Sequence, residues 1–497
     1  MRARLLLAAA LSAVPGLAQG LQPSILFVVA DDLGWQDLGW REVAPGELTD
    51  MHGATDFLDT LAAEGVKLDQ LYVSPVCSPT RAQLMTGQYG VRIGFLDALT
   101  PIQAPGILPL DVPSLAEGMR GQGYATGLVG KWHVGFADRA ALPINRGWDK
   151  AFNYYGGVMN YFTKVGGGQN GFLDIHDMGG PDRDERHVDP GFYSGFLWQE
   201  RTEQIIREHA ELGTDQPLFM YYAMQNPHGA QPLVPDEYRA MQPCASMADD
   251  SRQIICGMVS LVNENMQKTH TMMRDMLDPN YILILMADNG GNPSEGGYNM
   301  PLLGSKGTMF DGGVRSASFI WSESLPTNAR GSTYRGLIHV TDWLPTLMHI
   351  ASSGEWAPEP ERVLDGYNQW PSLISGGAVE SPRASALLGY YSGMRGAALR
   401  WNTEGHEYKI VLYAQASRAV YIPVPASFSS AGLNATGDDH LHGGRAPINQ
   451  TLRGRGLMGG GGGGQNGGAN CSGTGNQLRC YWLFDLSVDD TVSQAFL

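Results

Sequence analysis

The segment SILFVVADD, residues 24–32, decides the fold of this chain. Its apolar run is rich in β-branched side chains and does not alternate with polar ones, so it predicts a central β-strand that is buried on both faces. Asp31 and Asp32 follow directly where this strand ends. Open parallel sheets bind ligands beyond the carboxyl ends of their strands, so these two carboxylates are candidate ligand-binding residues.

Three later segments repeat this pattern of a buried strand that ends in polar residues. The strands are expected at residues 125–130, 218–224 and 281–287. The polar residues that follow them are Lys131, His133, Asn226, His228, Asp288 and Asn289. Because the carboxyl ends of parallel strands share one edge of the sheet, we expect these groups to meet there although they are far apart in the sequence.

Helical segments separate these strands. Apolar residues recur at helical spacing in residues 55–65, 114–123, 196–212 and 254–276. The alternation of strands and helices predicts an α/β fold with a large mixed, mostly parallel sheet that is sandwiched by helices. The loop GSKGTMFDGGVR, residues 304–315, leads into a strand-like segment at residues 317–321 and offers Lys306 to the same edge of the sheet.

The segment VCSPTRAQLMTGQYG, residues 76–90, contains the cysteine for which we expect chemistry. Ser78 can act as an N-cap and Pro79 suits a first turn, so residues 81–88 predict a short helix with Cys77 just before its N-terminus. Such an end attracts anions, and Arg81 adds a planar positive group that suits a tetrahedral oxyanion. The alternative is a buried or disulfide-bonded cysteine, the usual state in a secreted chain.

The composition allows a large globular enzyme. A chain of 497 residues with 43% hydrophobic residues can bury a large core, and this length suggests one large domain plus a smaller one. The net charge of −16 argues against a nucleic-acid partner. An anionic substrate would therefore have to be attracted by a local cluster of cations.

Residues 1–20 predict a cleaved signal peptide, because two arginines precede an apolar run too short to span a bilayer, and small residues follow it. No later apolar run has the length of a membrane span. We therefore expect a protein of the secretory pathway, either extracellular or lysosomal. The glycosylation sequons at Asn434, Asn449 and Asn470 suit that compartment.

The character of the chain changes at about residue 383. Residues 383–497 predict a smaller C-terminal α+β domain, with strand-like segments at residues 408–413 and 481–486. Between them, residues 432–476 form a polar, glycine-rich insert that we expect to be a flexible, glycosylated loop.

The polar residues at the strand ends divide into two chemical sets. Asp31, Asp32, Asp288 and Asn289 offer hard oxygen ligands that suit Ca²⁺ or Mg²⁺ better than zinc. The cationic or basic set, which suits a tetrahedral anion and its leaving group, consists of Arg81, Lys131, His133, His228 and Lys306. Each residue alone is more often structural or solvated, so it is their shared location that indicates function.

Several motifs, in order, resemble the type I sulfatases. They are DDLGWQDLGW (31–40), CSPTR (77–81), GKWHVG (130–135), NPH (226–228), DNGG (288–291), GSKGTMFDGGVR (304–315), HVTDWLPTL (339–347) and LDGYNQWPSL (364–373). The last two are most similar to the arylsulfatase B group, which removes the 4-sulfate of N-acetylgalactosamine. The resemblance covers residues 23–382 and implies an alkaline phosphatase-like catalytic domain at residues 21–382.

The resemblance also implies a cofactor set and a mechanism. Cys77 would be converted to formylglycine by the formylglycine-generating enzyme, and its hydrate would attack the sulfur of a sulfated carbohydrate or aryl sulfate. One Ca²⁺ would be held by Asp31, Asp32, Asp288 and Asn289 together with the modified Cys77. Arg81, Lys131 and His133 would orient the hydrate, while His228 and Lys306 would bind sulfate and assist the leaving oxygen. One position departs from the family pattern: Gln88 stands where many members have a basic residue.

The five cysteines also fit this maturation. With Cys77 set aside, the other four form two pairs that are close in sequence, Cys244 with Cys256 and Cys471 with Cys480. Spacing alone does not fix the connectivity, so both disulfides are expectations.

Two alternatives to a sulfatase remain open from the sequence. A phosphodiesterase or phosphonate hydrolase of the same superfamily would share the sheet and the metal ligands, but such enzymes commonly use a serine or threonine nucleophile. A catalytically silent secreted binding protein could keep the fold, but it would not need the ligands, the cysteine and the cations together.

Overall fold

The structure is a computed structural model, and its described residues fall in ten segments. These are residues 22–99, 104–167, 171–180, 183–185, 191–229, 234–391, 396–403, 406–413, 469–472 and 479–485. The predicted signal peptide and the sequons at Asn434 and Asn449 lie outside them, as does most of the predicted glycine-rich insert.

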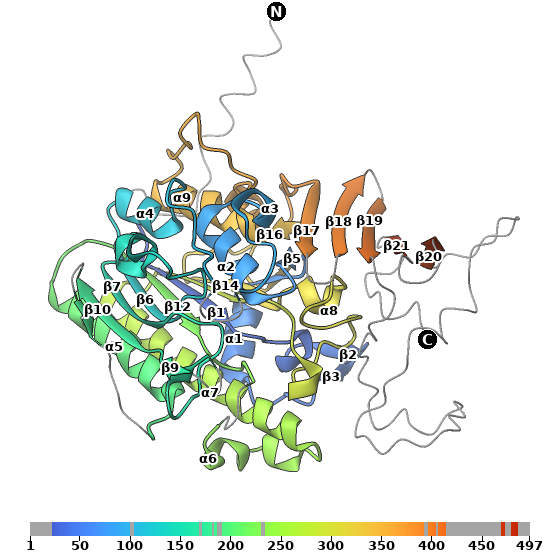
Figure 1. The fold of residues 1–497 in the computed structure, drawn as a ribbon, viewed down its shortest axis with the longest axis horizontal. Helices are drawn as coiled ribbons and strands as arrows, with labels where there is room; N and C mark the ends of the chain where they lie inside the picture. The colour runs from blue at the N-terminus through green and yellow to red at the C-terminus, as the bar shows by residue number, and fades with distance from the viewer. Residues whose placement is uncertain are drawn as a thin grey trace, which may run out of the picture.

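The four strands predicted to end in polar residues are neighbours at the centre of a ten-stranded sheet (Figure 1). Their order across the sheet is β6 (Ala125–Lys131), β12 (Leu218–Met224), β1 (Ile25–Ala30) and β13 (Ile282–Ala287). All three contacts between them are parallel. Their carboxyl ends therefore lie along one edge, as the sequence predicts.

The outer strands make the sheet mixed. On the β6 side lie β7 (Lys150–Tyr154), β10 (His176–Gly180) and β11 (Arg183–Glu185); beyond β13 lie β14 (Ser318–Trp321), β4 (Val66–Leu68) and β15 (Ser332–Tyr334). β14 is antiparallel to both of its neighbours, and so is β10. The predicted mixed sheet with a parallel centre is confirmed.

Helices cover both faces of the sheet (Figure 1). Alternate residues of β1 enter two separate cores, because successive side chains of a strand point to opposite faces. The first core contains Leu26 and Val28 and is covered by α1 (Asp56–Glu64), α5 (Ser194–Glu211) and α7 (Asp250–Met272). The second contains Ile25 and Phe27 and is covered by α2 (Cys77–Thr86), α4 (Leu115–Gly121) and α9 (Trp343–Ala351).

A second sheet begins at Ser385, close to the predicted boundary at residue 383. Its order is β17 (Ser385–Tyr391), β18 (Gly396–Thr403), β19 (His406–Tyr413), β21 (Arg479–Asp485) and β20 (Ala469–Ser472), and all its contacts are antiparallel. Among the described residues after Ser385 there are strands and no helix, so only the β part of the predicted α+β domain is seen. That the two parts form separate domains stays a prediction.

Shorter elements connect these layers. They are β2 (Glu42–Ala44), β3 (Glu47–Leu48), β5 (Leu71–Tyr72), β8 (Val165–Gly166), β9 (Phe172–Leu173), β16 (Ile338–His339), α3 (Gly90–Ile93), α6 (Asp236–Arg239), α8 (Asp311–Val314) and α10 (Trp370–Leu373). Among the described residues, no helix is both long enough and apolar enough to cross a membrane.

Part of the region predicted as a glycine-rich loop is a strand. Residues Ala469–Ser472 form β20, which pairs with β21 and is the edge strand of the second sheet. In that pairing Cys471 lies directly opposite Cys480. The predicted disulfide between Cys244 and Cys256 is confirmed, while the Cys471–Cys480 bond stays a prediction.

A buried ion network joins the second sheet to the loop that carries Lys306. Lys409 on β19 is 1% exposed and donates to Asp311, the first residue of α8. Tyr72 on β5 donates to the same carboxyl over 3.1 Å, and it accepts a hydrogen bond from Arg400 on β18. Burial raises the pKa of the Asp311 carboxyl, but Lys409 and the neighbouring arginines outweigh it, so the pKa lies below its usual range.

Removing the cation from this network should destabilise the protein. We expect Lys409→Met to cost about 3–5 kcal/mol, because it leaves the Asp311 carboxylate buried without its closest partner. Differential scanning calorimetry should show a melting temperature lower by about 5 °C or more. The matched control is Lys150→Met, whose exposed pair with Glu208 should contribute less than about 1 kcal/mol. Equal shifts for both variants would contradict a structural role of the buried pair.

Candidate active site

The two carboxylates after β1 are held by backbone contacts to the neighbouring strand ends. The Asp31 N–H donates to the Asn226 carbonyl after β12 over 3.2 Å, and the Asp32 N–H donates to Asp288 Oδ1 after β13 over 3.2 Å. Asp32 has a φ of 63°, a left-handed conformation that turns the chain sharply where the strand ends. The parallel register thus brings three carboxylates to one buried point.

Cys77 is the first residue of α2 rather than the residue before a helix. The predicted start at residue 81 is wrong, since α2 runs from Cys77 to Thr86 after Val76 as its N-cap. Ser78 is not the cap because its hydroxyl accepts the Leu99 N–H over 3.0 Å. Pro79 fits because the N–H groups of a first helical turn have no partner within the helix.

The Cys77 thiol faces the carboxylates. Its Sγ lies 3.6 Å from Asp31 Oδ1, and the residue is 4% exposed. Burial raises the pKa of the Cys77 thiol to about 12. An unmodified cysteine here would be a neutral thiol at pH 7, which is a poor nucleophile.

Arg81 and Lys131 hold two of the carboxylates. Arg81 donates from Nε and Nη2 to Asp288 Oδ2 over 3.0 and 2.7 Å, and Lys131 Nζ donates to Asp31 Oδ2 over 2.6 Å. Burial and the nearby Asp288 raise the pKa of Asp31 to about 7 despite these cations. The pKa of Asp288 lies below its usual range because Arg81 and Lys131 outweigh the effect of burial.

Lys306 and His228 form the outer side of the site. Lys306 Nζ donates to Asp32 Oδ2 over 2.5 Å and lies 3.2 Å from His228 Nε2. Burial opposes ionisation of Asp32, but Lys306, His228 and Lys131 together outweigh it and lower the pKa of that carboxyl. Burial and the Lys306 charge lower the pKa of His228 to about 3. Its Nδ1 lies 3.0 Å from the Gly229 carbonyl, so the neutral ring carries its proton on Nδ1 and Nε2 accepts.

His133 follows β6 in a left-handed conformation with a φ of 53°. Its Nε2 lies 3.3 Å from the Leu99 carbonyl, while its Nδ1 is buried and has no hydrogen-bond partner in the part of the chain that the structure describes. Burial and the charges of Lys131 and Arg81 keep the pKa of His133 well below its usual range. The histidine therefore presents a neutral ring beside the cations.

The donor set fits a hard metal ion. Oxygen or sulfur atoms of Asp31, Asp32 and Cys77, together with a ring nitrogen of His228, lie within 4.8 Å of one another. Asn289 Nδ2 donates to Asp32 Oδ1 over 2.7 Å, whereas the buried Asn289 Oδ1 has no hydrogen-bond partner among the described residues. A buried amide oxygen without a partner next to two carboxylates is suited to a cation.

The structure brings all ten predicted site residues to this one edge of the sheet. Asp288 is not among the four residues with mutually close ligand atoms, and its oxygens accept hydrogen bonds from Arg81 and the Asp32 N–H. His228, expected from the sequence to bind sulfate and not the metal, is one of these four residues. Their individual roles remain proposals.

Sequence reasoning missed the residues that hold His228 in place. The Tyr161 hydroxyl donates to the Gln225 and His228 carbonyls over 3.0 and 2.8 Å. The Gln225 side chain accepts from Ser194 Oγ and Trp198 Nε1 over 2.7 and 3.1 Å. Gln225 directly follows β12, but its partners Tyr161, Ser194 and Trp198 lie in segments without strand-end signals, so the sequence offered no sign of these contacts.

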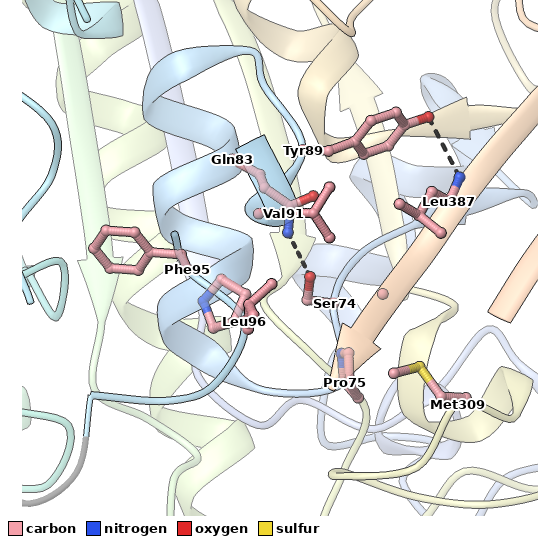
Figure 2. Close-up of a pocket in the computed structure, with 12 residues that line it drawn as sticks. Ser74, Pro75, Gln83, Tyr89, Val91, Phe95, Leu96, Met309 and Leu387 are labelled. Atoms are coloured by element: carbon pink, nitrogen blue, oxygen red, sulfur yellow. Dashed lines mark hydrogen bonds between the residues drawn. The ribbon is translucent and has the colours of Figure 1, made fainter. Parts of the chain in front are cut away.

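A separate cavity lies on the other side of α2, between α3 and β17 (Figure 2). It offers about 300 Å³ of space that is partly open to solvent. Figure 2 shows Gln83 bonded to Ser74, and the Leu387 N–H bonded to the Tyr89 hydroxyl. None of the ten predicted site residues lines this cavity, so we do not assign the chemistry to it.

Residues 23–353 match the family model named Sulfatase. The chain belongs to the sulfatase family. This sulfatase is 35% identical to arylsulfatase J of Mus musculus over 75% of its own length and 59% of that protein, so it spans less than two thirds of that relative. It is 28% identical to N-acetylgalactosamine-6-sulfatase of Sus scrofa, over 78% of this chain and 72% of that protein.

A similar solved structure is that of Ps i-CgsB in complex with k-i-k-neocarrahexaose. It has a TM-score of 0.67 and 25% identity, and it covers 80% of this chain and 85% of that chain. The predicted sulfatase family and fold are thereby confirmed, and the relatives do not favour the phosphodiesterase or binding-protein alternatives. The arylsulfatase B group stays a prediction, since the relatives carry other names.

Metal binding should be visible as thermal stabilisation. After treatment with a chelator, addition of a divalent cation should raise the melting temperature, because a ligand at about a hundred times its Kd stabilises by about 2.7 kcal/mol. Asp31→Asn should reduce this shift, whereas Asp215→Asn on the exposed surface should leave it unchanged. A shift that is the same in both variants, or absent for both Ca²⁺ and Mg²⁺, would contradict a metal site at Asp31.

Proposed function

We propose that this protein hydrolyses sulfate esters of carbohydrates. The observation that carries the proposal is the position of Cys77 Sγ, 3.6 Å from Asp31 Oδ1, beside the buried Arg81 and Lys131. A buried cysteine at a helix start next to paired carboxylates and cations suits an electrophile that carries several negative oxygens. The names of the relatives support sulfate as that group.

The proposal includes two groups that the family uses. Asp31, Asp32 and Asn289 would hold one Ca²⁺ with the residue at position 77, and Asp288 would support this set through its contact with the Asp32 N–H. Formylglycine at position 77 would supply a hydrated aldehyde as the nucleophile, and Ca²⁺ would act as a Lewis acid on the sulfate oxygens. We propose that the bound ion is Ca²⁺ and not Mg²⁺.

The chain's own cations would bind the sulfate and orient the residue at position 77. Arg81 and Lys131 each retain N–H groups beyond those that bond Asp288 and Asp31, and both lie next to Cys77. Their fixed positions need no rearrangement when negative charge develops on the sulfate oxygens, which lowers the barrier. The neutral His133 would hydrogen-bond the nucleophile without adding charge.

Lys306 and His228 would act on the leaving oxygen. Since His228 Nε2 accepts, the donor nearest to that position is the ammonium of Lys306, which His228 and Asp32 hold from two sides. A sugar alkoxide is a poor leaving group, so it requires a proton or strong electrostatic support as the bond to sulfur breaks. In this proposal Lys306 supplies that support and His228 positions Lys306.

The substrate class is inferred from chemistry and from relatives. A chain with a net charge of −16 attracts a sulfated sugar only through this local group of cations. One relative is named for N-acetylgalactosamine 6-sulfate, and one similar structure contains a neocarrahexaose. We therefore propose a sulfated sugar or glycosaminoglycan-like substrate, with the 4-sulfate of N-acetylgalactosamine as one candidate and aryl sulfates as artificial substrates.

The proposed compartment is the secretory pathway, with an extracellular or lysosomal destination. The Cys244–Cys256 disulfide supports it, because such bonds persist in oxidising compartments. The formylglycine-generating enzyme would then be the partner during maturation.

Modification of Cys77 is directly measurable. We expect mass spectrometry of the peptide with Cys77 to show formylglycine after expression with the modifying enzyme, and Cys77→Ala to lose essentially all activity. Cys244 and Cys256, which are disulfide-bonded, serve as internal controls in the same digest. An active preparation with only free thiol at Cys77 would contradict the mechanism.

The leaving-group role predicts a dependence on the substrate. His228→Ala should lower kcat/KM at least about tenfold more for a sulfated sugar than for 4-nitrocatechol sulfate, because a phenolate leaves without assistance. Arg81→Ala should lower both alike, since it acts on the nucleophile and the sulfate. His52→Ala, at an exposed histidine, is the matched control. If His228→Ala lowers kcat/KM equally for both substrates, His228 has no role at the leaving oxygen and only contacts the sulfate.

A further inference from the structure

Glu295 is a partly buried carboxylate beside the outer side of the active site. It ends the short 3-10 turn Pro293–Glu295, which follows Asp288 and Asn289 in the loop after β13. The Asn292 side chain caps this turn by accepting the Ser294 N–H. The loop that carries Asp288 and the proposed metal ligand Asn289 therefore also carries a second carboxyl group, that of Glu295.

The backbone at His228 is shaped to receive Glu295. The Glu295 carboxyl lies directly against the Gly229 backbone. A Cβ atom at Gly229 would lie 2.2 Å from Glu295 Oε2, so any other residue at position 229 would displace the carboxyl. Glu295 is thus seated directly against the segment that presents the His228 ring.

The other end of the turn is also fixed. Gly296 has a φ of 91°, and a Cβ there would lie 2.4 Å from the Ser251 carbonyl oxygen. Arg252 on α7 donates to the Gly296 carbonyl over 3.0 Å. Glu295 is therefore held by the fold rather than being a mobile surface side chain.

The charges of the site act on this carboxyl. Burial and the Asp32 charge raise the pKa of Glu295, while Lys306 opposes them. Lys306 already bonds Asp32 and His228, and the three inner carboxylates each have a cationic partner. Glu295 thus adds a negative charge close enough to interact with Asp32 and Lys306 on the outer side of the site.

We propose that Glu295 is a specificity-determining residue that selects against sugars with a second anionic group near the reacting sulfate. This inference rests on the proposed sulfatase function. The carboxylate accepts a hydrogen bond from a neutral sugar hydroxyl, but it repels a second sulfate or a uronate carboxylate in the same position. Rejection by a fixed like charge is a general means of discrimination between similar ligands.

The test measures discrimination rather than activity alone. For wild type, Glu295→Gln and Glu211→Gln, kcat/KM is measured with a monosulfated sugar, the same sugar with two sulfates, and an aryl sulfate. Glu295→Gln keeps the size and polarity of the side chain but removes its charge. Dividing each sugar value by the aryl sulfate value removes any common effect of the variant on the reaction centre.

Glu211→Gln is the matched control for the loss of one negative charge. Glu211 is exposed at the end of α5, which precedes the first residue of β12. It therefore lies at the amino-terminal edge of the sheet, about 20 Å from the site across seven residues of strand. A long-range effect of net charge would appear equally in this variant.

We expect Glu295→Gln to raise the disulfated-to-monosulfated ratio of kcat/KM about tenfold, and Glu211→Gln to leave it within about twofold. In wild type the ratio should rise with added salt, because salt screens the repulsion, and the variant should lose this dependence. An unchanged ratio in Glu295→Gln, or the same change in Glu211→Gln, would overturn the inference. Absence of activity on every sulfate ester in wild type would instead overturn the proposed function.

Discussion

The structure depends on six charged side chains, five of them buried and Lys306 partly buried, that meet at the carboxyl ends of four parallel strands. Asp31, Asp32 and Asp288 are each paired with one cation, Lys131, Lys306 and Arg81 respectively. Removing one partner of a buried pair costs several kcal/mol, because the other charge is left without compensation. Every element that contributes a member must therefore keep its position, which explains why the surrounding segments are so extensively anchored. With three charges of each sign, the site is nearly neutral, and a divalent cation would make it attractive to a sulfate ester.

The anchoring comes from layers that are distant in the sequence. The parallel strands fix Asp31 and Asp288 through their backbones, whereas Lys306 arrives on a loop that runs into α8. That loop is held from the second sheet by the Lys409–Asp311 pair. The second sheet therefore supports the loop that carries Lys306 without contributing one of the ten predicted site residues. In this arrangement the strands set the position of the anionic groups, and helices and loops deliver the cations against them.

The parts of the site that follow strands could be predicted from the sequence, because a buried parallel strand has a simple signature and its end is a fixed location. The start of α2 could not be predicted in this way. All ten residues of α2 are buried, so the helix has no solvent-exposed polar face that would mark it in the sequence. The expected cap, Ser78, instead accepts a hydrogen bond from the Leu99 N–H. Tyr161 and Glu295 were missed for another reason: each acts through a contact with the segment around His228 that no local pattern encodes. The neighbouring order of the four central strands was likewise a result of tertiary structure, although their type was predictable.

The contrast between the acidic chain and the anionic substrate that we propose indicates how recognition would work. A net charge of −16 acts at long range, but at physiological ionic strength exposed charges are screened beyond about 8 Å. Arg81 and Lys131 are almost inaccessible, so their interaction with a bound sulfate is screened far less than that of surface charges. Binding must then rely on direct contacts in the buried site rather than on electrostatic steering, and discrimination must rely on groups within a few ångströms of the sugar. A single fixed carboxylate at the outer side of the site would have its largest effect under these conditions, because a partly buried charge is screened less than an exposed one.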